Sequence, residues 1–554
     1  MAEQAAANGQ GRPLAEVSSR SSRRPAFPLV LIWLLLVPLA LAMRLPPVHD
    51  SLWLDELHTS WTVQGPWNEV ALRAAEGNQT PVYFWGVWWI VRCLGESEWT
   101  LRLLSLVAGV TLVPAVALLG FLWTRSAILA TLAACLVVFD PHCVYFAREA
   151  RPYALAQLLV VVHFMAFTGR LAGQRGSRLA WNLTLWLAFF THCTTVLVVA
   201  AELAVISFSR WRRSWRTPVT RRSWLQDLGL GILVGGCAVP YLSQLAARRT
   251  NWEAFVPVPE LAALGRLFAW IPYVFVPVLC AACVSVFIPR WLLTPRREAA
   301  GPGADNHFLQ RLAVGRWLRW DWPLACILAW YIVPAVLAWT STRLGIAAIF
   351  FRRYLMTTAV AWFLFAAWCG LRLRPRGPRL LFSVLVLAAV AATHGQWVDF
   401  YYGRHSGEAW RSAVGWVRET DATGRTLLWL RPGLIEDRAA EDAALRDYLQ
   451  FPVRGLYRVT QPVDRVEVLA RDWNGWNDRQ WQRLREEPRG LLLARGTLES
   501  RQSLLARCEA AARERGGRWE TSEVREFPGV TVVRFQVTCP APTERNPASE
   551  SLAE

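Results

Sequence analysis

Long apolar runs alternate with short polar segments along the first 393 residues of the chain. The first run, FPLVLIWLLLVPLALAM, covers residues 27–43, and ten further runs follow it. A helix needs about 20 consecutive, mostly apolar residues to cross a bilayer, and many of these runs approach that length. The pattern predicts a polytopic α-helical membrane protein with about eleven spans. The later runs cover residues 101–123, 126–145, 152–168, 179–191, 194–209, 225–245, 265–288, 322–340, 355–371 and 379–393.

Segment 81–95, PVYFWGVWWIVRCLG, decides the predicted topology. If this segment does not span, arginine-rich loops such as 170–178 and 210–222 lie on the same side as the N-terminus. If it does span, those loops move to the outer side. Cytoplasmic loops carry an excess of basic residues, which favours the first arrangement. We therefore expect 81–95 to form an amphipathic helix in the outer interface, with the N-terminus inside and the C-terminus outside.

The two ends of the chain differ from the apolar region between them. Residues 1–26 are polar and predict a disordered cytoplasmic tail, and 27–393 form the membrane domain. Residues 394–554 are charged, and helix-like stretches alternate with strand-like ones such as TLLWL and VTVVRFQV. This pattern predicts a soluble, extracytoplasmic α/β domain. That compartment permits a disulfide between Cys508 and Cys539, although two free thiols remain an alternative.

Composition agrees with a membrane protein. The chain is 54% hydrophobic, has a mean hydropathy of +0.23 and contains 32 Trp, a residue that favours membrane interfaces. Its net charge of +18 would suggest nucleic-acid binding in a soluble protein. Here the basic residues fall in loops between apolar runs, so we attribute them to orientation in the bilayer and expect no nucleic-acid partner. The CxxC at Cys280 and Cys283 lies inside an apolar run, which favours a buried helix face over a metal site.

Three charged stretches fall at outer ends of predicted spans. The first outer loop, 44–100, contains SLWLDELHTSW with Asp55 and Glu56. The stretch FAREARPYAL occupies 146–155, and a third stretch occupies 342–355. A lone charge in an outer loop is usually solvated, so it is the recurrence at one face that indicates a site.

The second stretch predicts a phosphate-binding site. Pro152 suits the first turn of a helix, so a helix N-terminus faces outward beside Arg148 and Arg151. Free backbone N–H groups and arginines together bind phosphate well. Arg352 and Arg353 could form a second clamp. The alternative is that these arginines meet lipid headgroups or pair with acidic side chains.

These stretches carry a family resemblance. The paired Asp55–Glu56, the FAREARPYAL stretch, LGESEWTLRLLS at 94–105 and the late Arg353–Tyr354 resemble features of the GT-C glycosyltransferases. The chain is most similar to the branch that contains protein O-mannosyltransferases and the lipid A aminoarabinose transferase. The resemblance covers roughly 27–393 and, weakly, the C-terminal segment. It implies a polyprenyl-phosphate sugar as donor and a membrane domain of the GT-C type.

The resemblance also implies residue roles. Asp55 would be the general base, with Glu56 assisting it. The residues expected to bind the donor and its phosphate are Arg148, Glu149, Arg151, Tyr153, Arg353 and Tyr354. Three auxiliary positions are His58, Arg352 and Arg102. Members of this branch generally need no metal or other cofactor, and metal ligation by Asp55 with Glu149 remains a minor alternative.

The sequence therefore predicts an inverting transfer of a sugar from a polyprenyl-phosphate donor at the outer, periplasmic face of the inner membrane. The sugar is not readable, and the acceptor could be a protein hydroxyl, lipid A, a cell-wall polymer or another glycan. A transporter or lipid flippase is the main alternative. Transporters tend to carry ionisable residues at mid-membrane, often with internal repeats. Here Glu202 is the main charge inside a predicted span, and no internal repeat is visible, which argues against transport. A non-catalytic membrane scaffold is a third reading.

Overall fold

The chain, described from a computed structural model, folds into two compact units. Unit 1 comprises residues 1–49 and 67–403, and unit 2 comprises 50–66 and 404–554. The structure describes residues 27–46, 48–212, scattered positions between 225 and 243, 256–265, 271–287, 322–373, 376–395, 407–434, 446–471, 473–496 and 498–538. The expected tail 1–26 and most of the predicted span 225–245 lie outside these ranges.

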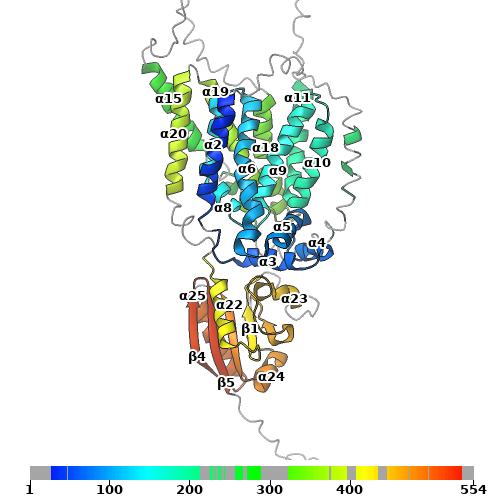
Figure 1. Ribbon diagram of the computed structural model, residues 1–554, viewed down its shortest axis with the longest axis vertical. Helices are drawn as coiled ribbons and strands as arrows, with labels where there is room; N and C mark the ends of the chain where they lie inside the picture. Colours follow the sequence, from blue (N-terminus) through cyan, green and yellow to red (C-terminus); the bar gives the residue numbers. More distant parts are fainter. Residues whose placement is uncertain are drawn as a thin grey trace, which may run out of the picture. The chain divides into compact units, whose positions relative to one another are not determined.

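Unit 1 is a bundle of helices (Figure 1). Two short 3₁₀ helices, η2 (Cys193–Val196) and η5 (Arg352–Thr358), interrupt it. The α-helices are α2 (Phe27–Arg44), α4 (Trp67–Glu76), α5 (Pro81–Leu94), α6 (Glu98–Thr124), α7 (Ala127–Phe139), α8 (Pro141–Ala147), α9 (Tyr153–Leu171), α10 (Ser177–Thr191), α11 (Leu197–Arg212), α14 (Ala262–Gly265), α15 (Ile271–Phe287), α18 (Trp322–Arg343), α19 (Ala359–Arg372) and α20 (Arg376–Gly395).

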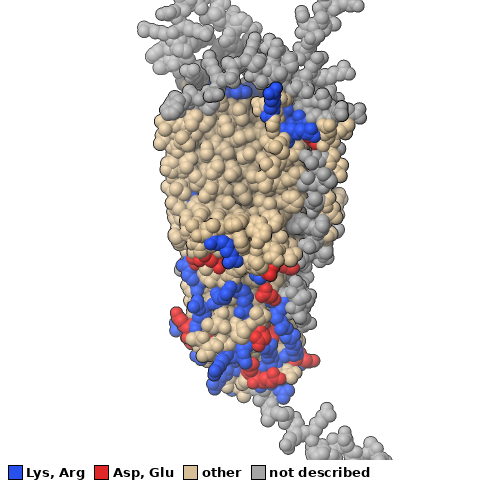
Figure 2. Space-filling model, turned by 45° about the vertical axis from the view of Figure 1, so that its right-hand side comes forward, with Lys and Arg blue, Asp and Glu red and all other residues tan. Residues whose placement is uncertain are grey.

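Several of these helices can cross a membrane. Within the described residues, four helical segments are long and apolar enough, namely α6, α9, α18 and η5 joined to α19. A fifth span results if α7 and α8, which meet at an angle of 59°, count as one broken helix. The visible face of unit 1 carries a broad band without charged residues (Figure 2). These helices indicate a membrane location, whereas the count of eleven spans remains a prediction.

The break between α7 and α8 has a local cause. Pro141 has no N–H to donate and cannot continue the helix of α7. The Asp140 carboxylate accepts a hydrogen bond from Cys143 N at 2.9 Å and so caps the new helix. Gly109 of α6 packs directly on Ala147, the last residue of α8, where a side chain on Gly109 would clash. This close packing fixes where the stretch from Arg148 onward begins.

Segment 81–95 is helical, as the sequence predicts. Its helix α5 buries Tyr83, Phe84 and Val87 on one face, whereas Trp89 is exposed. α5 packs against α4 and α6 in unit 1. The helix is thus confirmed, whereas its amphipathic character and its place in the outer interface stay predictions, because its exposed residues include the apolar Trp89 and Leu94.

Unit 2 contains the expected α/β domain. Its five-stranded sheet has the order β2-β1-β3-β5-β4, in which β1 runs parallel to β2 and β3, and β5 runs antiparallel to β3 and β4. The predicted strand segments TLLWL and VTVVRFQV coincide with β1 and β5. The elements are β1 (Leu427–Arg431), β2 (Val466–Val468), β3 (Arg489–Arg495), β4 (Arg518–Phe527), β5 (Val530–Thr538), α22 (Trp410–Thr420), α23 (Arg446–Leu449), η8 (Phe451–Val453), η9 (Val463–Arg465), α24 (Asp478–Glu486) and α25 (Leu498–Glu514).

The core of this domain is aromatic. Trp519 stacks on Phe535 with ring centroids 3.9 Å apart, and Trp476 stacks on Trp519 at 5.9 Å. Cys508 is buried in α25 beside this core. Its expected partner, Cys539, lies outside the described residues, so the disulfide remains a prediction.

Unit 2 also contains a segment from near the start of the chain. Helix α3 (Leu54–Gln64) belongs to residues 50–66, which pack with 404–554. The sequence pattern assigns this segment to the first outer loop of the membrane domain. In the structure its packing partners come from the C-terminal domain, and this changes how the acidic pair is held.

Candidate functional site

The acidic pair lies in the first turn of α3. Glu56 is fully buried, and its Oε2 accepts a hydrogen bond from Trp53 N at 3.4 Å, so it caps its own helix. Asp55 keeps part of its side chain exposed. Adjacent residues on a helix are rotated by about 100°, so the two carboxylates point in different directions. Asp55 is therefore the more accessible acid of the pair, and Glu56 caps the helix that carries it.

His58 is buried in an aromatic environment within unit 2. Its ring lies 6.0 Å from Trp61 and from Tyr448, and 5.5 Å from Phe451 of η8. Its carbonyl oxygen accepts a hydrogen bond from Thr62 Oγ1 at 2.7 Å. These contacts fit a packing role for His58 between α3 and the C-terminal domain.

In unit 1, the stretch between α8 and α9 carries the predicted donor-binding residues. Arg148 and Glu149 are buried, and a guanidinium nitrogen of Arg148 donates to the carbonyl oxygen of Met43. Arg151 is also buried, and its own carbonyl oxygen accepts from Ser105 Oγ at 2.9 Å. The Arg148 side chain thus ties this stretch to the end of α2, and the Arg151 carbonyl ties it to α6.

Arg148 belongs to a group of three fully buried arginines. Arg44 donates to the carbonyl oxygen of Val137 at 2.9 Å, and Arg102 donates to that of Val48 at 2.9 Å. Like Arg148, each of them therefore contacts a main-chain oxygen. This geometry fits a structural role for Arg102 and Arg148. Arg44 was not among the predicted residues, and its signal in the sequence is a charge directly after the first apolar run.

A second group of predicted residues converges on His192, which lies between α10 and η2. The His192 ring is 5.6 Å from Tyr153 and 5.7 Å from Tyr354. Burial, followed by the positive charges of Arg151 and Arg353, lowers the pKa of His192 to about 3. Both guanidinium groups thus lie within electrostatic range of one neutral imidazole.

Helix η5 is anchored on its neighbours by hydrogen bonds. Thr194 Oγ1 donates to the carbonyl oxygen of Tyr354 at 3.0 Å and also lies 2.8 Å from His192 Nδ1. Gln157 of α9 donates to the carbonyl oxygen of Met356 at 3.1 Å. These bonds hold the arginine-bearing end of η5 beside the start of α9.

The side chains of η5 reach toward aromatic rings and a second histidine. The Arg353 guanidinium carbon lies 5.1 Å from the Phe351 ring centroid and 5.9 Å from that of Tyr354. The exposed Arg352 contacts the His142 imidazole of α8. The two arginines of η5 thus differ, because Arg353 faces the His192 group and Arg352 faces α8.

We refer to five of these residues as the His192 cluster, namely Arg151, Tyr153, His192, Arg353 and Tyr354. The chemistry of this cluster suits an anion. Guanidinium groups form charge-assisted hydrogen bonds with phosphate oxygens, and tyrosine hydroxyls can donate further ones. His192 was not predicted, although it lies between the apolar runs 179–191 and 194–209 at the expected outer end. Among the described residues, no group of three or more His, Cys, Asp or Glu side chains could hold a metal ion.

No protein-family model matches the chain, and no curated protein matches it significantly. Among solved structures, it is similar to ArnT from Cupriavidus metallidurans in the apo state, with a TM-score of 0.50 and 13% identity. The alignment covers 92% of this chain and 98% of that chain. A structure of ArnT from the same organism bound to undecaprenyl phosphate aligns at a TM-score of 0.47, with 13% identity and the same coverage. The likeness to the apo structure shows the fold alone, an ArnT-like GT-C fold.

Proposed function

We propose that the chain is a membrane glycosyltransferase that moves a sugar from a polyprenyl-phosphate carrier to an acceptor at the outer face of the membrane. The observation that carries this proposal is the convergence of Arg151 and Arg353 on the neutral His192. Two cations gathered in a bundle of apolar helices fit a ligand that combines a phosphate with a long apolar chain.

The His192 cluster would bind the donor phosphate. Arg151 and Arg353 would neutralise its charge, and the hydroxyls of Tyr153 and Tyr354 would supply further hydrogen bonds. A neutral His192 can donate or accept a hydrogen bond at a ring nitrogen without adding a third positive charge. Arg352 beside His142 would attract the anionic headgroup before it docks.

Asp55 would be the general base for the transfer. The acceptor oxygen attacks the anomeric carbon as its proton passes to the Asp55 carboxylate. The bond from that carbon to the phosphate oxygen breaks, and its electron pair stays with the polyprenyl phosphate. The arginines stabilise the charge that develops on this leaving group. A single displacement inverts the configuration at the sugar carbon, and Glu56 assists by capping the helix that carries Asp55.

Two further observations support this function. The sequence stretches that resemble GT-C transferases include Asp55–Glu56 and FAREARPYAL. The chain also shares the fold of ArnT, a protein that has itself been crystallised with undecaprenyl phosphate. Neither observation identifies the sugar or the acceptor. The remaining parts of the proposal are an inner-membrane location, a cytoplasmic N-terminus and a periplasmic C-terminal domain.

The full chain, purified in lipid nanodiscs, tests the proposal. It would be incubated with polyprenyl-phosphate sugars and candidate acceptors, and the release of polyprenyl phosphate would be measured. We expect the wild type to consume at least one donor and Asp55→Asn to lose that activity. An Arg175→Gln variant, altered at an exposed position between α9 and α10, is the control that should keep it. If no donor is consumed and labelled lipid instead crosses the bilayer of proteoliposomes, the chain is a flippase.

A further inference from the structure

The helix that carries the acidic pair begins on a carboxylate from the C-terminal domain. Leu54 N, the first N–H of α3, donates to Glu408 Oε2 at 3.1 Å. Leu52 N, two residues earlier, donates to the Tyr457 hydroxyl at 3.0 Å. The first N–H groups of a helix have no partner within the helix, and a negative charge at this end also meets the positive end of the helix dipole. Residues far along the chain thus supply the N-terminal cap of α3.

Both carboxylate oxygens of Glu408 accept hydrogen bonds. Its Oε2 also accepts from Trp410 Nε1 at 2.7 Å, and its Oε1 accepts from Arg495 of β3 at 2.8 Å. The side chain is buried, with 9% of its surface exposed. A buried carboxylate with both oxygens hydrogen-bonded is held rigidly, so it can define where α3 starts.

The main chain around Glu408 is anchored to the sheet. Ala409 N donates to the carbonyl oxygen of Pro528 at 2.8 Å, in the turn between β4 and β5. Gly529 in this turn has φ +65°, and a Cβ there would lie 2.6 Å from the carbonyl oxygen of Gly407. The turn therefore accepts only glycine at this position, and its close approach fixes Glu408 relative to β5.

The rest of α3 is held by a second set of contacts. Ser60 Oγ accepts from Leu456 N at 2.6 Å, and a Cβ on Gly455 would lie 2.6 Å from the same oxygen. Near the end of the helix, Arg458 donates to Gln64 Oε1 at 2.8 Å. Contacts at the start, the middle and the end of α3 thus hold it against the C-terminal domain.

We propose that Glu408 is a positioning residue for Asp55, so that the C-terminal domain is required for the proton transfer as well as for stability. The inference rests on the proposed function, because Asp55 acts there as the base. Asp55 follows Leu54 directly, so the bond to Leu54 N sets the position and direction of the turn that carries the carboxylate. Loss of this bond loosens the first turn and misdirects Asp55.

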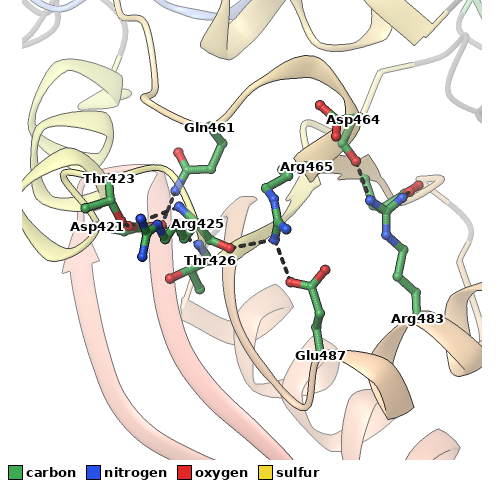
Figure 3. A network of polar contacts seen from close by, with 10 residues as sticks. Asp421, Thr423, Arg425, Thr426, Gln461, Asp464, Arg465, Arg483 and Glu487 are labelled. Atoms are coloured by element: carbon green, nitrogen blue, oxygen red, sulfur yellow. Dashed lines mark hydrogen bonds and ion pairs between the residues drawn. The ribbon is translucent and has the colours of Figure 1, made fainter.

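Three variants of the full chain test this role. Glu408→Ala removes the cap. Glu408→Gln with Arg495→Gln keeps an oxygen for Leu54 N and replaces the ion pair with an amide pair, which makes it the rescue variant. Asp421→Asn is the matched control, because Asp421 is another buried carboxylate that accepts main-chain hydrogen bonds, here from Arg425 and Thr426 (Figure 3).

The first measurements are kcat and the donor KM, with hydrogen exchange of the α3 amides. For Glu408→Ala we expect kcat to fall about 10-fold or more while donor KM changes less than about 2-fold, because the donor is bound in unit 1. We expect faster exchange at Leu54–Leu57 in this variant, near-normal values in the rescue variant, and unchanged α3 exchange in the control. If the α3 amides of Glu408→Ala exchange faster but kcat is unchanged, the proposal is overturned. It is also overturned if their exchange is as slow as in the wild type.

A double-variant cycle separates positioning from general damage. In an Asp55→Asn background, Glu408→Ala should lower the residual rate no further, because the group that Glu408 positions is already gone. An additive loss in that background would mean that Glu408 only stabilises the fold, which contradicts the proposal. If the wild type consumes no donor, the proposed function fails, and the hydrogen-exchange result alone decides whether Glu408 holds α3.

Discussion

The imidazole of His192 lies 5.7 Å from the ring of Tyr354, although one follows α10 and the other belongs to η5. The contact places a neutral histidine beside Arg353, within the site proposed for the donor phosphate. Because burial and two arginines lower the pKa of His192 to about 3, the ring stays uncharged over the whole physiological range.

This low pKa predicts a pH dependence of stability. His192 titrates at about 3 in the folded chain and near its ordinary value of 6.5 in the unfolded chain. The contribution of His192 is therefore full above pH 6.5 and is lost as the pH falls toward 3, because only the unfolded chain takes up the proton. The slope for one proton is about 1.4 kcal/mol per pH unit.

Comparison with His192→Gln isolates this effect. Thermal unfolding of both proteins in detergent, measured from pH 7 to 4.5, should show a steeper fall for the wild type by about one proton. Parallel curves for the two proteins would mean that the imidazole titrates normally and is not enclosed by the arginines.

The arginines of the His192 cluster should control donor affinity. We expect Arg353→Gln and Arg151→Gln each to raise the Kd for polyprenyl phosphate by about 10-fold or more, because each removes a charge-assisted contact to phosphate. Fluorescence titration with polyprenyl phosphate in nanodiscs would measure this change. Arg175→Gln should bind as the wild type does, and equal binding by all three variants would place the phosphate elsewhere.

Arg148 should behave differently from Arg151, although both lie in the FAREARPYAL stretch. The Arg148 guanidinium is fully buried and donates to the carbonyl oxygen of Met43. We expect Arg148→Gln to lower the unfolding temperature and to leave the donor Kd of the folded fraction near the wild-type value. Its loss leaves a buried carbonyl oxygen with a weaker partner, at a cost of about 1–3 kcal/mol. A normal unfolding temperature with lost donor binding would restore the role that the family resemblance implies.

The sequence alone identifies only part of the candidate site. The motif identifies the positions 148–155, but it cannot tell which guanidinium is buried. That depends on the packing of Gly109 against Ala147, which sets the depth of the chain between α8 and α9. The strands of the C-terminal domain were readable, because the continuous apolar run in TLLWL and the alternating apolar positions in VTVVRFQV need only local information.

The surroundings of the acidic pair could not be read in this way. The bonds from Leu54 to Glu408 and from Leu52 to Tyr457 join residues 354 and 405 positions apart, and no local pattern encodes such pairs. His192 was missed for a different reason. A single histidine between two apolar runs is usually a packed or solvated residue. Only the residues that surround it in the structure indicate a role in binding.

The two acids of α3 should have unequal effects on catalysis. Asp55→Asn removes the proposed base and should lower kcat by about 10²–10⁴-fold. Glu56→Gln keeps an oxygen that can accept from Trp53 N, so we expect a fall in kcat of less than about 10-fold. Steady-state kinetics with a saturating donor would distinguish the two. A larger loss in Glu56→Gln than in Asp55→Asn would make Glu56 the base.

A second buried polar group in unit 1 should support the fold and not the reaction. His163 Nε2 lies 2.9 Å from Glu202 Oε1, and Trp181 Nε1 lies 3.1 Å from Glu202 Oε2, so the carboxylate joins α9, α10 and α11. Both His163 and Glu202 are about 1% exposed. Removal of one partner of a buried pair costs about 3–5 kcal/mol, whereas replacing both by apolar residues costs much less.

We therefore expect Glu202→Leu to lower the unfolding temperature strongly and His163→Leu/Glu202→Leu to recover much of the loss. Turnover of polyprenyl-phosphate sugar, measured per folded molecule, should stay near the wild-type value in the double variant, because neither residue belongs to the His192 cluster. Ionisable residues within a membrane commonly mark transport pathways. A double variant that is stable but inactive, in sugar transfer or in lipid flipping, would show that the pair between α9 and α11 takes part in function.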